Sequence, residues 1–152
     1  MPTGSSSLVG EEAAADPDVR MSGMSRSSLL VRWFPALGMM AAIFALSSLT
    51  SDRIPFFGEY DLLVKKGAHA VGYAMLATAY YFALPSRLSP VYRAVLSFLM
   101  AVLFALSDEF HQSFVRGRHS ALRDVGIDSL GALLALLAAT VYSSNSSSNS
   151  VS

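Results

Sequence analysis

Four long apolar stretches constrain this chain more than any other feature of its sequence. They run from Trp33 to Leu49, from Gly67 to Leu84, from Val91 to Leu106 and from Val125 to Tyr142. Each approaches the roughly 20 residues that an α-helix needs to cross about 30 Å of hydrocarbon. The third and fourth are slightly short, so we expect those helices to continue into flanking residues. The pattern predicts an all-α, multi-pass membrane protein with four transmembrane helices.

The composition favours a membrane protein over a soluble helical one. Hydrophobic residues make up 53% of the 152 residues and charged residues 14%, whereas a typical soluble domain is about 25% charged. Four such stretches in so short a chain argue against a soluble bundle. No convincing small-residue cleavage site follows the first stretch, which argues against a signal peptide. The balance of 11 basic and 11 acidic residues favours no nucleic-acid partner, and the lack of cysteine excludes disulfides and thiolate metal sites.

The segments outside the apolar stretches divide the chain into a membrane domain and two tails. Residues 1–28 are rich in Ser, Gly, Ala and acids, and residues 143–152 have the sequence SSNSSSNSVS, so both are predicted to be disordered. Within the membrane domain, residues 29–142, a short hairpin at 85–90 separates the second and third helices. Longer polar loops cover residues 50–66 and 107–124. In a chain that crosses the membrane four times, these two loops lie at the same face.

Small residues follow one face of the predicted helices. Helices in lipid pack through small residues, because lipid provides no hydrophobic drive between them. The stripes comprise Gly38, Ala41, Ala45 and Ser48 in the first helix, Ser97, Ala101 and Ala105 in the third, and Gly131, Ala135 and Ala139 in the fourth. We expect these faces to form the helix contacts.

Polar residues continue these packing faces. They are Lys66, His69 and Tyr73 in the second helix, Glu109 beyond the third stripe, and Asp124 and Asp128 beside the fourth. Ionisable groups at such depths normally face a partner or a water-filled cavity. Their convergence predicts a four-helix bundle with a polar pocket at one membrane face.

Several of the polar residues also have an ordinary explanation. Lys66 fits an interfacial anchor whose ammonium reaches the head groups, and Tyr73 fits a packing or interface aromatic. The remaining cations and histidines are expected in loops or at the interface: Arg87, Arg93, His111, Arg116, His119 and Arg123. Asp128, His69 and Glu109 resist this explanation, because they lie within or beside apolar stretches.

Two motifs carry a resemblance to a known family. The segment KGAHAVGYAML (66–76) fits a K-x-x-H-x-x-x-Y-x-x-L pattern, and DEFHQSFVRGRHSALRDVGIDSLGALL (108–134) fits D-E-x-x-Q-x-F-x-x-x-R before an acid that opens the last helix. With FALSS (44–48), they make the chain resemble the VanZ-like family of small bacterial membrane proteins, named for a member linked to teicoplanin resistance. The resemblance implies functional positions at Lys66, His69, Tyr73, Asp108, Glu109, Gln112, Arg118, Asp124 and Gly131. Arg116 and Asp128 depart from the proline and asparagine that are common in relatives.

The polar pocket suits the binding or modification of an anionic lipid or cell-envelope glycolipid head group. Arg118 offers a planar set of donors for phosphate or carboxylate, and Lys66 adds a second cation. Asp124 is expected to orient Arg118 or to stabilise the start of the fourth helix. The binding candidates are Lys66, Tyr73, Gln112, Arg118, Asp124 and Asp128. The resemblance implies a link to glycopeptide resistance or envelope stress.

Two other interpretations stay open. One is a membrane-embedded hydrolase or transferase, with His69 as general base and Asp108 or Glu109 holding it or binding a cation. Histidine and carboxylates suit a divalent metal by ligand type, but their spacing matches no metal motif such as H-E-x-x-H, and no other cofactor motif is present. The other is a purely structural polar network that fixes helix register.

Charge leaves the orientation in the membrane balanced. One side has Arg20, Arg26, Arg32 and Arg87, and the other has Arg53, Lys65, Lys66, Arg116, Arg118 and Arg123. If Lys66 and Arg118 belong to a site, the two counts are nearly even and the positive-inside rule gives no answer. Because site charges are retained for function, we expect both termini in the cytoplasm.

Overall fold

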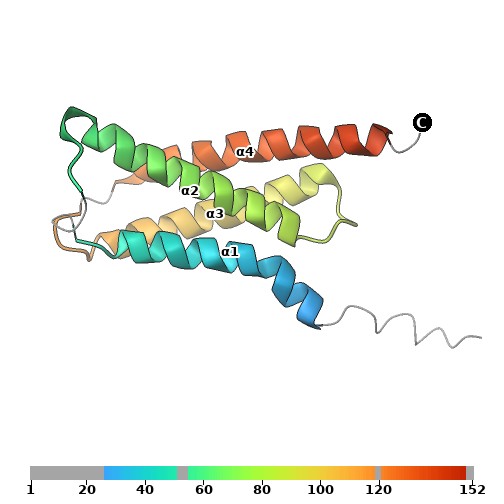
Figure 1. Ribbon diagram of the computed structural model, residues 1–152, viewed down its shortest axis with the longest axis horizontal. Coiled ribbons are helices and arrows are strands. Elements are labelled where there is room, and N and C mark those ends of the chain that lie inside the picture. Colours follow the sequence, from blue (N-terminus) through green and yellow to red (C-terminus); the bar gives the residue numbers. More distant parts are fainter. Residues whose placement is uncertain (1–25, 51–54, 119–120, 150–152) are drawn as a thin grey trace, which may run out of the picture.

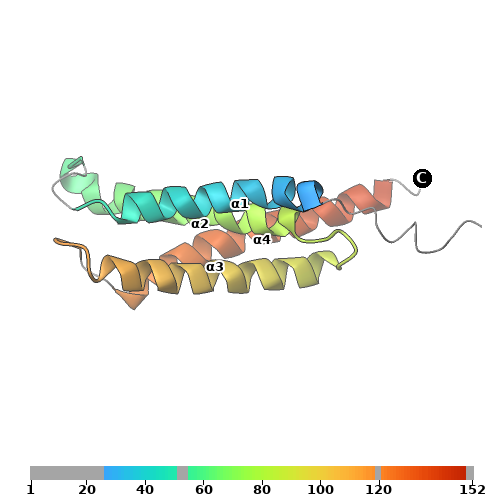
Figure 2. The same ribbon diagram turned by 90° about the horizontal axis from the view of Figure 1, so that it is seen from below.

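Four long α-helices make up most of the structure. The computed structural model describes residues 26–50, 55–118 and 121–149, and within them the helices are α1 (Arg26–Ser47), α2 (Asp61–Ala83), α3 (Pro90–Gln112) and α4 (Leu122–Asn149). A single 3₁₀ turn, η3 (Gly58–Tyr60), precedes α2. The helices run lengthwise beside one another, and successive helices are joined at alternate ends (Figures 1 and 2). The described part of the chain contains no strand, which confirms the predicted all-α bundle.

Three of the described helices are long and apolar enough to cross a membrane. These candidate spans are Leu30–Ser47, Pro90–Gln112 and Leu122–Asn145. The outer faces of the helices expose large apolar side chains, among them Phe34, Leu103 and Leu134, which lipid solvates but water does not. α2 has a similar length but is not among the three candidates. It runs beside the other three helices over much of their length (Figures 1 and 2).

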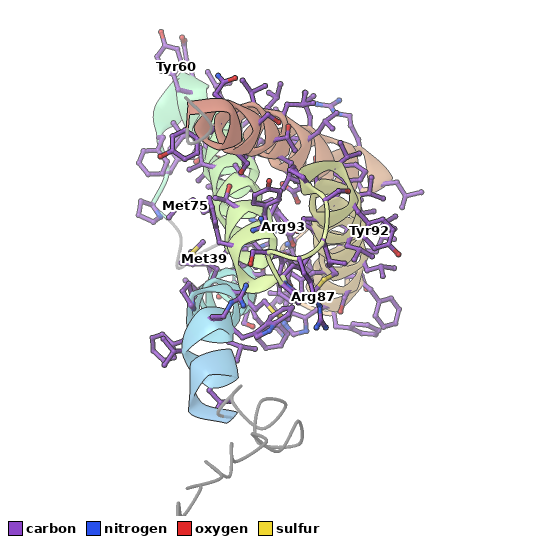
Figure 3. All side chains as sticks on the ribbon, turned by 90° about the vertical axis from the view of Figure 1, so that its right-hand side faces the viewer. Met39, Tyr60, Met75, Arg87, Tyr92 and Arg93 are labelled. Atoms are coloured by element: carbon purple, nitrogen blue, oxygen red, sulfur yellow. The ribbon has the colours of Figure 1, made fainter. Side chains whose placement is uncertain are left out.

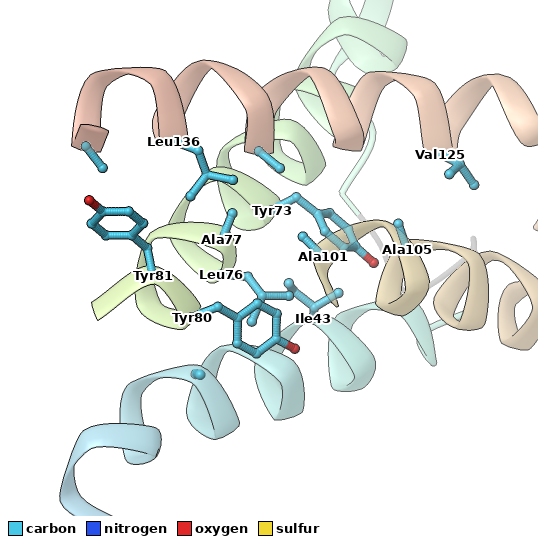
Figure 4. Close-up of a cluster of buried hydrophobic side chains, with 13 residues drawn as sticks. Ile43, Tyr73, Leu76, Ala77, Tyr80, Tyr81, Ala101, Ala105, Val125 and Leu136 are labelled. Atoms are coloured by element: carbon cyan, nitrogen blue, oxygen red, sulfur yellow. The ribbon is translucent and has the colours of Figure 1, made fainter. Parts of the chain in front are cut away.

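α2 is the central helix of the bundle, and it contacts all three of the others. Its Tyr73, Leu76 and Ala77 are almost fully buried against small residues such as Ala101 and Ala132 (Figure 4). α2 and α4 lie close together at Gly131, where an added Cβ would collide with the carbonyl oxygen of Ala70. The small residues thus allow close backbone contact, as expected for helices packed in lipid.

Two of the predicted small-residue stripes lie in the helix contacts and one does not. Ser97, Ala101 and Ala105 are buried, and on α4 Ala139 is buried while Gly131 and Ala135 are half-buried. The α1 stripe is wrong, because Gly38, Ala41, Ala45 and Ser48 are all exposed. α1 instead packs through Ala36, Ile43 and Ser47. This face includes larger residues that bury more surface, and residue size alone did not identify it.

All four helices extend beyond the apolar stretches, and the extension of α3 and α4 was expected. α1 begins at Arg26 and α2 at Asp61, so residues 26–28 and 61–66, which were predicted as part of a disordered tail and of a loop, are helical. α3 continues to Gln112, so Asp108, Glu109 and His111 lie on a helix and not in a loop. α4 begins at Leu122 and continues to Asn149, into the segment 143–152 that was predicted to be disordered. Residues 1–25 and 150–152 of the predicted tails lie outside the described residues, and the domain boundaries stay a prediction.

Two arginines hold the end of the bundle at the 85–90 hairpin. Arg32 of α1 donates to the carbonyl of Leu84 at 2.6 Å. Arg93 of α3 points toward the bundle interior (Figure 3), donates to the Tyr81 carbonyl at 2.5 and 3.1 Å, and lies 4.1 Å from the Tyr81 ring centroid. Both cations neutralise the partial negative charge at the C-terminal end of α2. Arg93 is therefore not the simple interfacial cation that was expected, whereas Arg87 is exposed in the hairpin.

Candidate functional site

A polar cavity of about 240 Å³ lies at the end of the bundle opposite the hairpin. It is enclosed by the start of α2, the end of α3, the start of α4 and the connection between α3 and α4 (Figure 1). The charged and polar side chains that line it are Lys65, Lys66, His69, Glu109, Gln112, Arg118, Asp124 and Asp128. Seven of the nine residues named as catalytic or binding candidates, all except Tyr73 and Asp108, therefore meet at one place, although their roles stay predictions.

Two contacts join α2 to α4 across the cavity. The Lys66 ammonium forms an ion pair with the Asp124 carboxylate, in the first turn of α4. One turn deeper, His69 Nδ1 lies 3.9 Å from Asp128 Oδ2. Lys66 and His69 are three residues apart on α2, and Asp124 and Asp128 are four apart on α4. Each two residues therefore share one helix face, about one turn apart, so the two contacts lie one above the other. Asp124 was expected either to orient Arg118 or to stabilise the start of the fourth helix. It pairs with Lys66 and not with Arg118, and it lies in the first turn of α4, as the second alternative states.

Two adjacent carboxylates of α3 have separate partners. Glu109 accepts a hydrogen bond from the backbone N–H of Ala121 at 2.5 Å, just before α4 begins. It therefore satisfies a backbone donor at the N-terminal end of α4, and its negative charge is stabilised by the positive end of the α4 dipole. Asp108 is 3% exposed and does not line the cavity; its Oδ2 accepts from Ser47 Oγ at 2.8 Å and from Gln112 Nε2 at 3.0 Å. The expected pairing of His69 with Asp108 or Glu109 is not seen among the described residues, because Asp128 occupies the position beside the imidazole.

Arg118 connects the α3–α4 loop to the end of α1. It follows Gly117, whose φ of 77° is a left-handed conformation that a glycine adopts easily. Its Nη2 donates to the Leu46 carbonyl at 2.8 Å, Nε to the Leu49 carbonyl at 3.3 Å and Nη1 to Gln112 Oε1 at 3.3 Å. All three of these acceptors are neutral, so none of them offsets the positive charge of the guanidinium.

The remaining site candidate, Tyr73, is buried beneath the cavity. It is 1% exposed, and its ring stacks near the His69 ring with centroids 6.5 Å apart and planes inclined by 24°. It also contacts Phe104 of α3. Tyr73 therefore lies next to His69 in the bundle interior, and it does not line the cavity itself.

Sequence reasoning missed two residues of this region. Ser47, fully buried, donates to Asp108 and accepts from Gln112 Nε2 at 3.2 Å, which ties α1 to α3. It lies within FALSS, but the small-residue stripe pointed to Ser48, whose exposed hydroxyl instead contacts His111. Lys65 also lines the cavity and is paired with Asp61 at 2.8 Å. That hydrogen bond holds the pKa of the Asp61 carboxyl, at the start of α2, below its usual value.

The described residues do not assemble a metal site. No group of three or more His, Asp or Glu side chains within them is arranged to hold a metal ion. The carboxylates that a metal would use are already engaged, since Asp124 pairs with Lys66 and Glu109 accepts from Ala121. The function proposed below therefore includes no metal-dependent step. His119 lies outside the described residues.

Comparison with known proteins identifies the family of the chain. The profile of the VanZ/LLP1 family matches residues 13–143, which include all four helix cores and every residue of the cavity. Neither a curated protein nor a solved structure matches the chain. The matched segment covers most of the 152 residues, and the helices are those of a membrane bundle. The chain therefore belongs to the VanZ/LLP1 family of membrane proteins.

Proposed function

We propose that the polar cavity binds the anionic head group of a membrane lipid or cell-envelope glycolipid. The observation that carries this proposal is the state of Arg118, which lines the cavity and has only neutral acceptors among the described residues. A guanidinium in that state attracts phosphate or carboxylate, and its planar donors fit two oxygens at once.

The other charged groups of the cavity have partners other than Arg118. Asp124 is paired with Lys66, Lys65 is paired with Asp61, and Asp128 lies beside His69. Glu109 accepts a hydrogen bond from the Ala121 backbone. An anion at the cavity would therefore find its cationic partner in Arg118, and the lipid bilayer is the nearest source of such anions.

A binding measurement with short-chain lipids tests this proposal. The purified protein in neutral detergent is titrated with dihexanoyl phosphatidic acid, and dihexanoyl phosphatidylcholine serves as the control with an equal chain and no net charge. We expect preference for phosphatidic acid and at least about tenfold weaker binding in Arg118→Ala, as for loss of a charge-assisted contact. Arg116→Ala, at an exposed position two residues away, should bind normally. Equal binding of both lipids, or no effect at Arg118, would contradict head-group recognition.

A second candidate function is a hydrolase or transferase that acts on such a lipid. The contact that favours it is His69 Nδ1 at 3.9 Å from Asp128 Oδ2, since a carboxylate beside one nitrogen orients the other toward substrate. Product release from phosphatidic acid by the wild type, and its loss in both His69→Gln and Asp128→Asn, would support catalysis. If the Lys66→Ala, Arg118→Ala double variant keeps full cellular activity, the network is only structural.

A further inference from the structure

A second, mostly apolar cavity of about 340 Å³ lies between α1 and α2. Ile43, Leu46 and Gly72 are among the residues that line it, with Ala42 and Ala68 at the exposed surface. In a membrane bundle such an exposed surface faces lipid. Its volume falls in the range of roughly 300–1,000 Å³ that is typical of ligand pockets. The apolar walls of this cavity were not assigned a role in the head-group recognition described above.

The apolar cavity adjoins the polar cavity along a shared rim. Lys65, His69 and Arg118 line both. A molecule at this rim therefore meets basic side chains and polar groups on one side and a hydrocarbon surface on the other. Arg118 sits at the junction because its guanidinium bonds the Leu46 and Leu49 carbonyls, and both of these residues also line the apolar cavity.

We infer that the α1–α2 cavity seats a hydrocarbon chain of the lipid whose phosphate-bearing head group lies at Arg118. The inference rests on the proposed function and adds the hydrocarbon chain to the head group as a part of the lipid that the protein recognises. Hydrocarbon gains little free energy by moving from bilayer to protein, so the cavity selects the chain by shape while Arg118 supplies the charge complementarity. A soluble phosphate ester has no hydrocarbon chain and would leave the α1–α2 cavity unoccupied.

Photocrosslinking locates the chain directly. The probe is a long-chain phosphatidic acid with a diazirine in one acyl chain, added to the protein in phosphatidylcholine vesicles. We expect labelled peptides from the α1 and α2 walls, around Ile43 to Leu46 and Ala68 to Gly72. Excess unlabelled phosphatidic acid should remove this labelling, whereas excess phosphatidylcholine should not.

A matched pair of variants on α1 supplies the control. Ala42→Trp fills the cavity from its exposed edge, whereas Ala45→Trp adds the same side chain at an exposed position outside the cavity lining. We expect Ala42→Trp to lower labelling at least about tenfold while it leaves binding of dihexanoyl phosphatidic acid unchanged. Ala45→Trp should change neither. Size-exclusion chromatography and helical circular dichroism confirm that both variants are folded.

The outcomes separate this inference from the proposed function. Labelling spread evenly over all lipid-facing helices, with short-chain phosphatidic acid still bound, would rule out chain binding in the α1–α2 cavity and leave head-group binding intact. Equal loss of binding of the long-chain and short-chain probes in folded Ala42→Trp would also rule out a separate binding site for the chain. Failure of the wild type to bind either probe would overturn both.

Discussion

Three arginines perform the same chemical task at different helix ends. Arg32 and Arg93 donate to carbonyls at the end of α2, and Arg118 donates to carbonyls at the end of α1. Helix C-termini carry partial negative charge and unsatisfied carbonyls, so a guanidinium stabilises them. Arg118 differs from the other two because it also borders both cavities. Its role as a ligand group must therefore be separated from its role as a helix cap.

The Arg118→Lys variant separates these roles. Lysine keeps the charge but cannot reach Leu46, Leu49 and Gln112 from one plane, so we expect loss of function with normal folding and insertion. The measurement combines protease protection of the inserted protein with sensitivity of cells to lipoglycopeptide or membrane stress. Arg116→Lys is the control at an exposed site. A normal phenotype in Arg118→Lys with loss of function only in Arg118→Ala would show that position 118 needs a positive charge but not the guanidinium geometry.

Ser47→Ala tests the buried bond between α1 and α3. The change removes a donor to Asp108 at 2.8 Å and leaves that carboxylate with Gln112. We expect a loss of about 1–3 kcal/mol in the free energy of unfolding, the usual cost of an under-satisfied buried polar group. Thermal unfolding in detergent measures it. Ser48→Ala, at the exposed neighbouring position, should cost much less, and equal losses at 47 and 48 would contradict a specific role of Ser47.

Sequence reasoning found most of the site residues but paired them incorrectly. Helical periodicity places Lys66, His69 and Asp124 on inward faces, because it depends on one helix at a time. It does not fix the height at which two helices face each other. That height brings Asp124 to Lys66 and Asp128 to His69, and so leaves Arg118 to the α1 carbonyls.

At the scale of the helix, hydropathy located each helix but not its ends. α3 extends past Leu106, where Asp108 and Gln112 form hydrogen bonds inside the bundle. Hydropathy counts these residues only as polar and so assigns them to a loop. The orientation of α1 was also missed, since small residues on that helix face lipid. The stripes were correct on α3 and largely correct on α4, where a neighbouring backbone approaches closely enough to require them.

Gly131 provides a test of that close approach. A Cβ there would collide with the Ala70 backbone carbonyl and lie 2.9 Å from the carbonyl carbon. The Ala70 backbone can move away only if the two helices separate, so Gly131→Ala should lower the free energy of unfolding by about 1–3 kcal/mol through overpacking. The readout is the midpoint of thermal unfolding in detergent.

Gly126 on the same helix is the matched control for Gly131. An added Cβ at Gly126 meets no atom within 4 Å. Gly126→Ala should therefore stabilise α4 by about 0.5–1 kcal/mol, because alanine favours the helix. Opposite signs for the two substitutions are the expected result. A neutral or stabilising effect at both positions would show that α2 and α4 do not pack closely at Gly131.

On the scale of the whole molecule, the bundle has two chemically different ends. The hairpin end is closed by Arg32 and Arg93, whereas the other end holds the polar cavity. The start of α1 and the end of α4 lie at the hairpin end (Figure 1), so both chain termini leave the bundle on the side away from the cavity. Orientation in the membrane therefore decides which compartment the cavity faces.

We propose that both termini are cytoplasmic and that the cavity opens on the opposite side of the membrane. Lys65 and Lys66 are held in ion pairs at the cavity, so they have a role in the fold apart from the positive-inside rule. Because the chain has no cysteine, single cysteines report topology without background. We expect Pro55→Cys and Ser113→Cys to react with a membrane-impermeant maleimide in intact cells, and Ser86→Cys to react only after permeabilisation. Reaction of positions 55 and 113 from opposite sides would break the four-helix arrangement, whereas reversal of all three would keep the bundle and invert its orientation.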